Sequence, residues 1–177
     1  MEFYLLLLKK KTTLSLQDEI RSCKRCPLFN MMGTSPVPPE WLGFPEVMFI
    51  IDVTISMGVD FAQTPLTGAT RLRFIQLIEK YFKQWYITPL IKCGPQNLTY
   101  SVGDYKICTK WIEDEVKRLN PRFIVGCGSK VEKYFKCDYY TMSPIRITQS
   151  KKHEKMFENL LMKIKEGLCQ PIITSSP

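Results

Sequence analysis

Short apolar runs mark the strands that the sequence predicts. Residues 47–51, Val-Met-Phe-Ile-Ile, are continuously apolar and rich in β-formers, which is typical of a strand buried on both faces. A second apolar strand is predicted to begin at Trp85 and to end near Lys92, and a third covers residues 122–126. The weaker pattern of residues 144–148, Pro-Ile-Arg-Ile-Thr, predicts a fourth strand.

Amphipathic segments between these runs predict helices. Apolar residues recur at helical spacing as far as Phe82, in a helix that is expected to start at Thr67 or Gly68. Strands that alternate with helices favour a parallel sheet with helices on both faces. We therefore expect a three-layer α/β/α fold around a four-stranded parallel sheet. Further helices are predicted over residues 15–23, 105–119, 129–135 and 152–166.

Length and composition fit one globular domain. The 177 residues are 45% hydrophobic and 24% charged, which excludes wholesale disorder and collagen-like or coiled-coil architecture. We expect a lead-in over residues 1–14, one domain over 15–168 and a tail over 169–177. The leucine run 5–8 is too short to cross a bilayer, and the lysines 9–11 follow it on the wrong side for a signal peptide. A soluble intracellular protein without a membrane partner is expected.

The chain is basic, with 25 Lys and Arg against 17 Asp and Glu and a formal net charge of +8. A basic excess of this size favours a polyanionic partner. Nucleic acid is the first candidate, ahead of a membrane surface.

Seven cysteines are the most informative residues of the sequence. Their odd number and a reducing compartment argue against a disulfide framework. Cys23 and Cys26 form a C-x2-C pair, whereas fourteen residues separate Cys93 from Cys108. A structural zinc site usually takes its second pair from another tight knuckle, but an iron–sulfur cluster tolerates irregular spacing. Buried apolar cysteines are the alternative. Basic neighbours are expected to help hold the thiolates deprotonated: Lys24, Arg25, Lys92 and Lys106.

Several segments, in the expected order, resemble the iron–sulfur branch of the uracil-DNA glycosylase superfamily, usually called family four. The resemblance covers roughly residues 14–167. It implies a uracil-DNA-glycosylase-like fold and a [4Fe–4S] cluster held by Cys23, Cys26, Cys93 and Cys108. The matching segments are Cys-Lys-Arg-Cys-Pro-Leu at 23–28, Pro-Leu-Thr-Gly at 65–68, Lys-Cys-Gly-Pro-Gln-Asn at 92–97 and Leu-Asn-Pro-Arg at 119–122.

The catalytic motifs of that family are degenerate in this chain. Asp52 stands where family members place the carboxylate that handles water, but the glycines that shape the pocket are missing. Leu66 replaces the aromatic residue that stacks on the flipped base, and it offers no π-face. Pro89 replaces the asparagine that reads the uracil edge, and its side chain neither donates nor accepts a hydrogen bond. Direct readout of uracil is therefore expected to be lost.

The last family motif, His-Pro-Ser, follows the fourth strand and enters the minor groove of DNA. The resemblance places Gln149 and Ser150 there, and both can bond to phosphate or base. Neither supplies the charge with which an imidazolium stabilises the departing base. Lys151 and Lys152 are expected to contact the DNA backbone. His153 is either a shifted electrophile or an exposed histidine of the last helix.

These features lead to one main hypothesis and two alternatives. The first is an iron–sulfur, DNA-binding accessory or recognition module without catalysis, acting in replication or repair beside a possible protein partner. The second is an active DNA N-glycosylase, a hydrolase that releases uracil or a modified base with Asp52 or Asp60. The third is a protein-interaction subunit whose basic surface docks onto an acidic partner.

Overall fold

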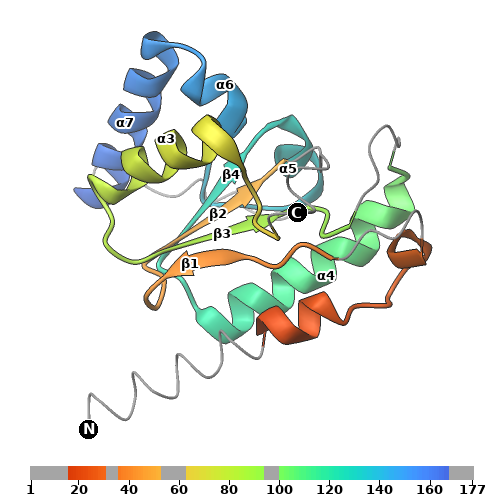
Figure 1. The fold of residues 1–177 in the computed structure, drawn as a ribbon. Helices are drawn as coiled ribbons and strands as arrows, with labels where there is room; N and C mark the ends of the chain where they lie inside the picture. Colours follow the sequence, from red (N-terminus) through yellow and green to blue (C-terminus); the bar gives the residue numbers. More distant parts are fainter. Residues whose placement is uncertain (1–15, 31–35, 53–62, 94–99, 168–177) are drawn as a thin grey trace, which may run out of the picture.

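A computed structural model describes residues 16–30, 36–52, 63–93 and 100–167. The fold is built on one mixed sheet of five strands in the order β1-β3-β2-β4-β5, with helices packed against it (Figure 1). The strands are β1 (Glu40–Leu42), β2 (Val47–Ile51), β3 (Trp85–Pro89), β4 (Phe123–Cys127) and β5 (Tyr139–Thr141). The helices are η1 (Pro27–Asn30), α3 (Gly68–Glu79), α4 (Val102–Leu119), α5 (Ser129–Tyr134), α6 (Pro144–Thr148) and α7 (Lys151–Lys165).

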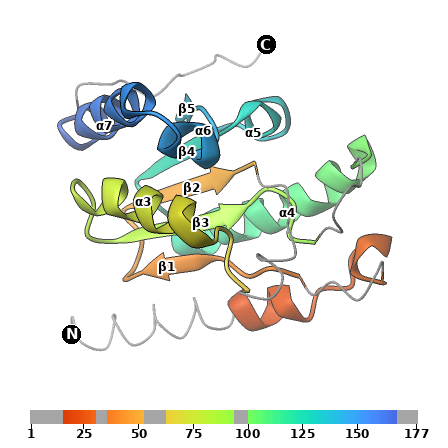
Figure 2. The same cartoon turned by 45° about the horizontal axis from the view of Figure 1, so that its top comes forward.

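The sheet has one strand more than the sequence predicts. Strands β3, β2, β4 and β5 are parallel, but β1 pairs antiparallel with β3, with Trp41 opposite Tyr86. A sheet of four strands, all parallel, is therefore wrong, although four parallel strands form its main part. Strand β1 is only three residues long and directly follows two prolines, which hid it from a search for apolar runs. Figure 2 shows β1 along one edge of the sheet.

The predicted fourth strand at 144–148 is wrong, because this segment forms helix α6. Pro144 occupies the first turn, where proline is preorganised for a helix and its missing N–H costs nothing. The last parallel strand is β5, whose Tyr139 pairs with Val125 of β4.

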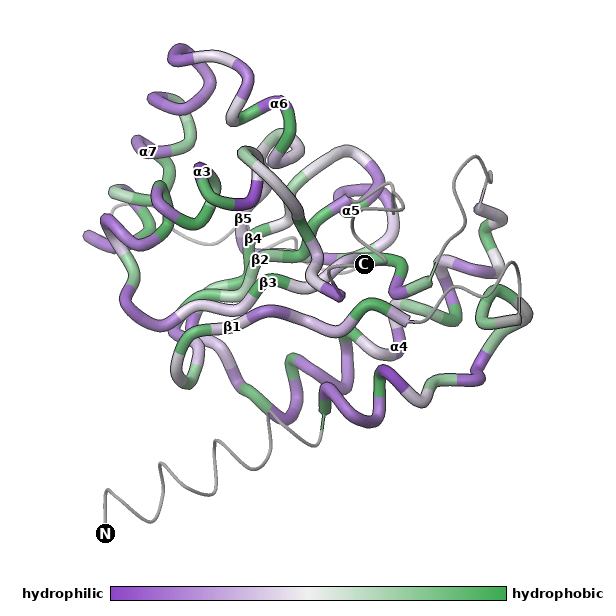
Figure 3. Tube along the Cα trace, viewed as in Figure 1, coloured by the Kyte–Doolittle hydropathy of each residue, from purple (hydrophilic) through white to green (hydrophobic). Residues whose placement is uncertain are grey.

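Two hydrophobic clusters lie on opposite faces of the sheet. Alternate residues of β2 point to opposite faces, so Phe49 packs against α3 and α7, whereas Ile50 packs toward α4 and α5. Figure 1 shows α3, α6 and α7 on one side of the sheet and α4 on the other. The central strands are hydrophobic along most of their length, as expected for a sheet covered on both faces (Figure 3).

Two helices begin earlier than the sequence predicts. Helix α4 starts at Val102 because Ser101 and Asp104 form a capping box, in which each side chain accepts a bond from the other's backbone N–H. Helix α7 starts at Lys151 because the Ser150 side chain accepts a bond from the backbone N–H of His153.

Three ion pairs fix the direction of α7. Glu154 binds Arg73 through two bonds of 2.6 Å, and Glu158 pairs with Lys80 further along α3. Near the other end of α7, Lys165 binds Glu46, which directly precedes β2. Helix α7 therefore starts near the edge where the parallel strands end, the carboxyl edge, and finishes at their amino edge. Among the described helices, none is both long and apolar enough to cross a membrane.

Candidate functional site

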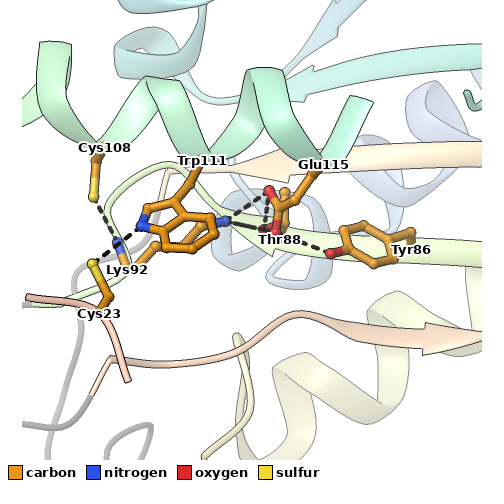
Figure 4. A network of polar contacts seen from close by, with 7 residues as sticks. All are labelled: Cys23, Tyr86, Thr88, Lys92, Cys108, Trp111 and Glu115. Carbon is orange, nitrogen blue, oxygen red and sulfur yellow. Dashed lines mark hydrogen bonds and ion pairs between the residues drawn. The ribbon is translucent and has the colours of Figure 1, made fainter. Parts of the chain in front are cut away.

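Four cysteines from three separate segments lie near the end of β3. Cys26, Cys93 and Cys108 share one buried cluster, and Cys23 is partly exposed beside them. Burial raises the pKa of Cys93, and the thiols of Cys108, Cys26 and Cys23 each raise it further. All four thiols are thus close enough to act on one another. In Figure 4, Cys23 and Cys108 point toward one another from different segments.

Backbone and indole N–H groups surround these sulfurs. The N–H of Lys92 donates to Cys108 Sγ at 3.4 Å, and the N–H of Arg25 donates to Cys23 Sγ at 3.5 Å. Trp111 Nε1 donates to Cys23 Sγ at 3.1 Å. Hydrogen bonds to sulfur are among the features that tune iron–sulfur clusters. These N–H groups would stabilise negative charge on the Cys23 and Cys108 sulfurs.

A stacked pair covers the outside of this cysteine group. The Arg25 guanidinium lies 3.6 Å from the ring centroid of Trp111 and pairs with Asp114 at 3.2 Å. Trp111 is only 3% exposed. A cation over an indole face is a stabilising arrangement, and here it holds the C-x2-C segment against α4.

Burial has the largest effect on the pKa of the two inner thiols, Cys93 and Cys108. It raises the pKa of Cys108 to about 11, although the N–H and the positive charge of Lys92 lower it. It also raises the pKa of Cys93, again against the charge of Lys92. The charge of Lys92 thus acts on both thiols in the direction expected of a basic neighbour, and burial outweighs it. Metal binding at this site would have to displace their protons.

A single zinc ion and an iron–sulfur cluster make different demands on these cysteines. Zinc needs sulfur ligands at about 2.3 Å from a single point. Within the described ranges, no three His, Cys, Asp or Glu side chains converge in a way that could hold one metal ion. A four-iron cluster makes a different demand, since each thiolate binds its own iron at a corner of the cluster. The residues that would hold it are Cys23, Cys26, Cys93 and Cys108.

A buried ion pair lies directly beside the cysteines. Lys92 and Glu115 are both fully buried, with Nζ–Oε distances of 2.9 and 3.0 Å. The Thr88 hydroxyl lies within hydrogen-bond reach of both, and the Tyr86 hydroxyl donates to Glu115 at 2.9 Å (Figure 4). The sequence analysis missed this network. The sequence signal that could have revealed the network is Glu115, which lies seven residues after Cys108 and therefore on the same inward face of α4.

A second candidate site lies at the carboxyl edge of the sheet. Asp52 directly follows β2, and Gly128 directly follows the neighbouring strand β4. Strand β3 lies on one side of β2, and the next strand in the sequence, β4, lies on the other side. Asp52 and Gly128 therefore lie where the strand order reverses. Ligands of open α/β sheets bind at such positions. Of the other catalytic candidate, Asp60, the structure describes nothing, since it lies outside the described ranges.

The Asp52 carboxyl is partly buried against the start of α5. Burial raises its pKa, although the backbone N–H of Lys130 donates to Oδ2 at 3.4 Å and lowers it. The carboxyl is therefore a weaker acid than an ordinary aspartate, which is a common property of functional carboxyls.

Replacing Gly128 with alanine is expected to destabilise the protein by about 1–3 kcal/mol. Gly128 has φ +111°, and an added Cβ would lie 2.7 Å from the Asp52 Cβ, so both the backbone and Asp52 would have to move. Gly103→Ala is the matched control, because this helical glycine has only ordinary contacts. Urea unfolding of both variants measures the difference. If the two variants have the same free energy of unfolding, the close fit of Gly128 against Asp52 does not hold Asp52 in place.

Three tyrosines separate the cysteines from Asp52. The rings of Tyr105 and Tyr134 stack at 4.0 Å and 5°, and Tyr100 meets Tyr105 edge-on at 6.0 Å. Burial raises the pKa of Tyr105, and the charge of Asp52 raises it further. Lys133 Nζ lies 5.1 Å from the Tyr134 ring centroid. The carboxyl edge thus presents aromatic rings beside a cation.

The structure brings two of the three expected pocket residues together. Pro89 is the register partner of Ile51, so it lies beside Asp52 at the strand ends. Leu66 is 6% exposed and belongs to the hydrophobic cluster on the α3 side. Its surroundings are those of a core residue.

The expected DNA-facing residues lie in a different structural setting. Gln149 ends α6, Ser150 caps α7, and Lys151 and Lys152 are exposed in its first turn. They follow a helix and not the last parallel strand, so the basis for aligning 148–152 with the His-Pro-Ser motif is wrong. They still lie toward the carboxyl edge, because α7 starts there. His153 is partly buried, with Nδ1 at 3.1 Å from the carbonyl oxygen of Arg146.

The chain matches no protein-family model, and no curated protein matches it.

Proposed function

We propose that this protein is an iron–sulfur, DNA-binding module of the uracil-DNA-glycosylase type that does not excise bases and serves replication or repair. The observation that carries the proposal is the group of four cysteines, whose thiols act on one another and receive N–H donors from Lys92, Arg25 and Trp111. The two-sided α/β sheet supports the three-layer fold that the resemblance implies.

A bound cluster would act as a cross-link between distant segments. It would join the C-x2-C segment, the turn after β3 and helix α4 through one rigid group. The protein's own contribution is to hold these segments in place. Arg25 stacks on Trp111 of α4, and Lys92 reaches Glu115 on the same helix.

The carboxyl edge supports a nucleic-acid partner. Aromatic rings on which bases stack and cations that contact phosphates are the usual elements of such surfaces. Lys133 is an exposed cation beside the Tyr134 ring, one face of which is already stacked on Tyr105. The segment that directly follows β5 adds Ile145, which is 50% exposed, and the exposed Arg146.

The same edge lacks features that base excision uses. Pro89 stands beside Asp52 and has no polar side-chain group with which to read a base. Leu66 is packed into the core. An active glycosylase remains the second candidate because of one observation: the Asp52 carboxyl is held at the strand switch point with a raised pKa.

Replacing Lys151 and Lys152 together with alanine is expected to weaken DNA binding at low salt. If each lysine contacts one phosphate, the slope of log affinity against log salt concentration becomes shallower by about two units. Filter binding at several salt concentrations measures this slope.

The control pair is Lys83→Ala with Lys117→Ala. Lys83 precedes β3 and Lys117 lies in the last turn of α4, so both exposed lysines belong to the amino edge. The control is expected to retain the wild-type slope. An unchanged slope in the Lys151 and Lys152 variant would show that these lysines are only solvated surface. No DNA binding by the wild-type protein would favour the third hypothesis, a protein-interaction subunit.

A further inference from the structure

The Lys92–Glu115 pair is the most completely buried charged feature among the described residues. Both side chains are 0% exposed, and the positions of both are fixed by hydrogen bonds. Replacing a buried ion pair by apolar residues is often neutral or stabilising, so stability alone is a weak reason for such a pair. Its place beside the cysteines gives a more specific reason.

The pair is oriented with its positive end toward the cysteines. Lys92 is the chain neighbour of Cys93, and its backbone N–H donates to Cys108 Sγ. Glu115 follows Cys108 by seven residues on α4, a separation of about 10 Å along the helix axis. In the view of Figure 4, the Lys92 ammonium lies between the sulfurs of Cys23 and Cys108 and the Glu115 carboxylate. The cysteines therefore lie in the field of the ammonium.

We propose that Lys92 and Glu115 form a fixed dipole that sets the reduction potential of the cluster held by Cys23, Cys26, Cys93 and Cys108. The inference rests on the proposed function, because it requires the cluster. Hydrogen bonds to sulfur, net charge and solvent exposure set the potential of an iron–sulfur cluster. A charge inside the protein acts more strongly than one in water, since the local dielectric constant is low. Lys92 favours the reduced, more negative cluster, and Glu115 limits that effect.

Two substitutions test the dipole because they remove opposite charges. Lys92→Met removes the cation and leaves Glu115, so the midpoint potential is expected to fall. Glu115→Gln leaves the ammonium uncompensated, so the potential is expected to rise. Protein-film voltammetry of the cluster-loaded protein measures both shifts without an activity assay.

Two further variants separate charge from structure. Lys92→Arg keeps the positive charge and is expected to remain close to the wild-type potential. Lys106→Met removes an exposed lysine two residues before Cys108 and is expected to shift the potential less than Lys92→Met, since solvent and salt screen its charge. If either buried single variant fails to fold, the double variant Lys92→Met with Glu115→Gln removes both charges. Its potential is expected to lie below that of the wild-type protein.

The results distinguish the dipole from the proposed function. The dipole would be overturned if the wild-type protein is coloured and the two single variants keep its potential, or if both variants shift the potential in the same direction. The proposed cluster would stand in either case. A purified wild-type protein without iron would refute the proposed function and the dipole with it. A purely structural pair would lower cluster content in both single variants and produce no opposite shifts.

Discussion

Replacing Cys93 with alanine is expected to abolish bound iron and visible absorbance in the purified protein. Cys93 is 2% exposed and lies among the other three thiols, so its loss would leave a cluster without one ligand. Packing around residues 23–30 and the start of α4 is expected to weaken as well. Absorbance spectra and iron analysis after purification without oxygen measure the effect.

The matched control is Cys127→Ala. Cys127 is fully buried, like Cys93, but it belongs to the hydrophobic cluster on the opposite face of the sheet. This variant is expected to keep its iron and its colour. Wild-type protein that contains zinc in place of iron would contradict the cluster and favour a zinc site.

Uracil release from DNA is expected to be undetectable under conditions in which an ordinary family member finishes quickly. Base excision needs a flipped base held by stacking and edge hydrogen bonds, a positioned water and stabilisation of the departing anion. Losing one stabilising donor typically slows catalysis by about a hundredfold to a thousandfold. Leu66 is packed into the core, and Pro89 has no polar side-chain group with which to hold a base. Alkaline scission of uracil-containing oligonucleotides, single- and double-stranded, measures release.

The companion variants are Asp52→Asn and Asp18→Asn. Asp52 lies at the carboxyl edge, whereas Asp18 is an exposed residue of the helical segment 16–21. Robust cleavage that disappears in Asp52→Asn and persists in Asp18→Asn would overturn the non-catalytic assignment. Asp52 would then be the catalytic carboxylate of an active glycosylase.

The fold could be predicted where single elements carry strong local signals. Residues 47–51 form β2 as expected, because a continuous apolar run rich in β-formers is typical of a strand buried on both faces. The 144–148 segment misled because two isoleucines alternate with polar residues there, as in a half-buried strand. The structure buries Ile147 and leaves Ile145 half exposed on a short helix. The true strand, Tyr139–Thr141, is too short to show a period.

The site was predictable only where spacing along the chain carried information. The C-x2-C pair and the two later cysteines led to the expectation that four thiols meet, and the structure buries three of them, Cys26, Cys93 and Cys108, in one cluster. The fit of Gly128 against Asp52 depends on the register of two strands, which no local pattern encodes. The bonds between Thr88, Lys92 and Glu115 likewise require β3 and α4 to be in place.

Both outer strands of the sheet are short. Strands β1 and β5 have three residues each, whereas the inner strands β2, β3 and β4 have five. An exposed strand edge offers unpaired N–H and C=O groups to which another chain can add a strand, and short edges offer few of them. The architecture therefore keeps its strongly apolar central strands away from edge-to-edge aggregation, a protection that a basic net charge of +8 reinforces by repulsion between copies.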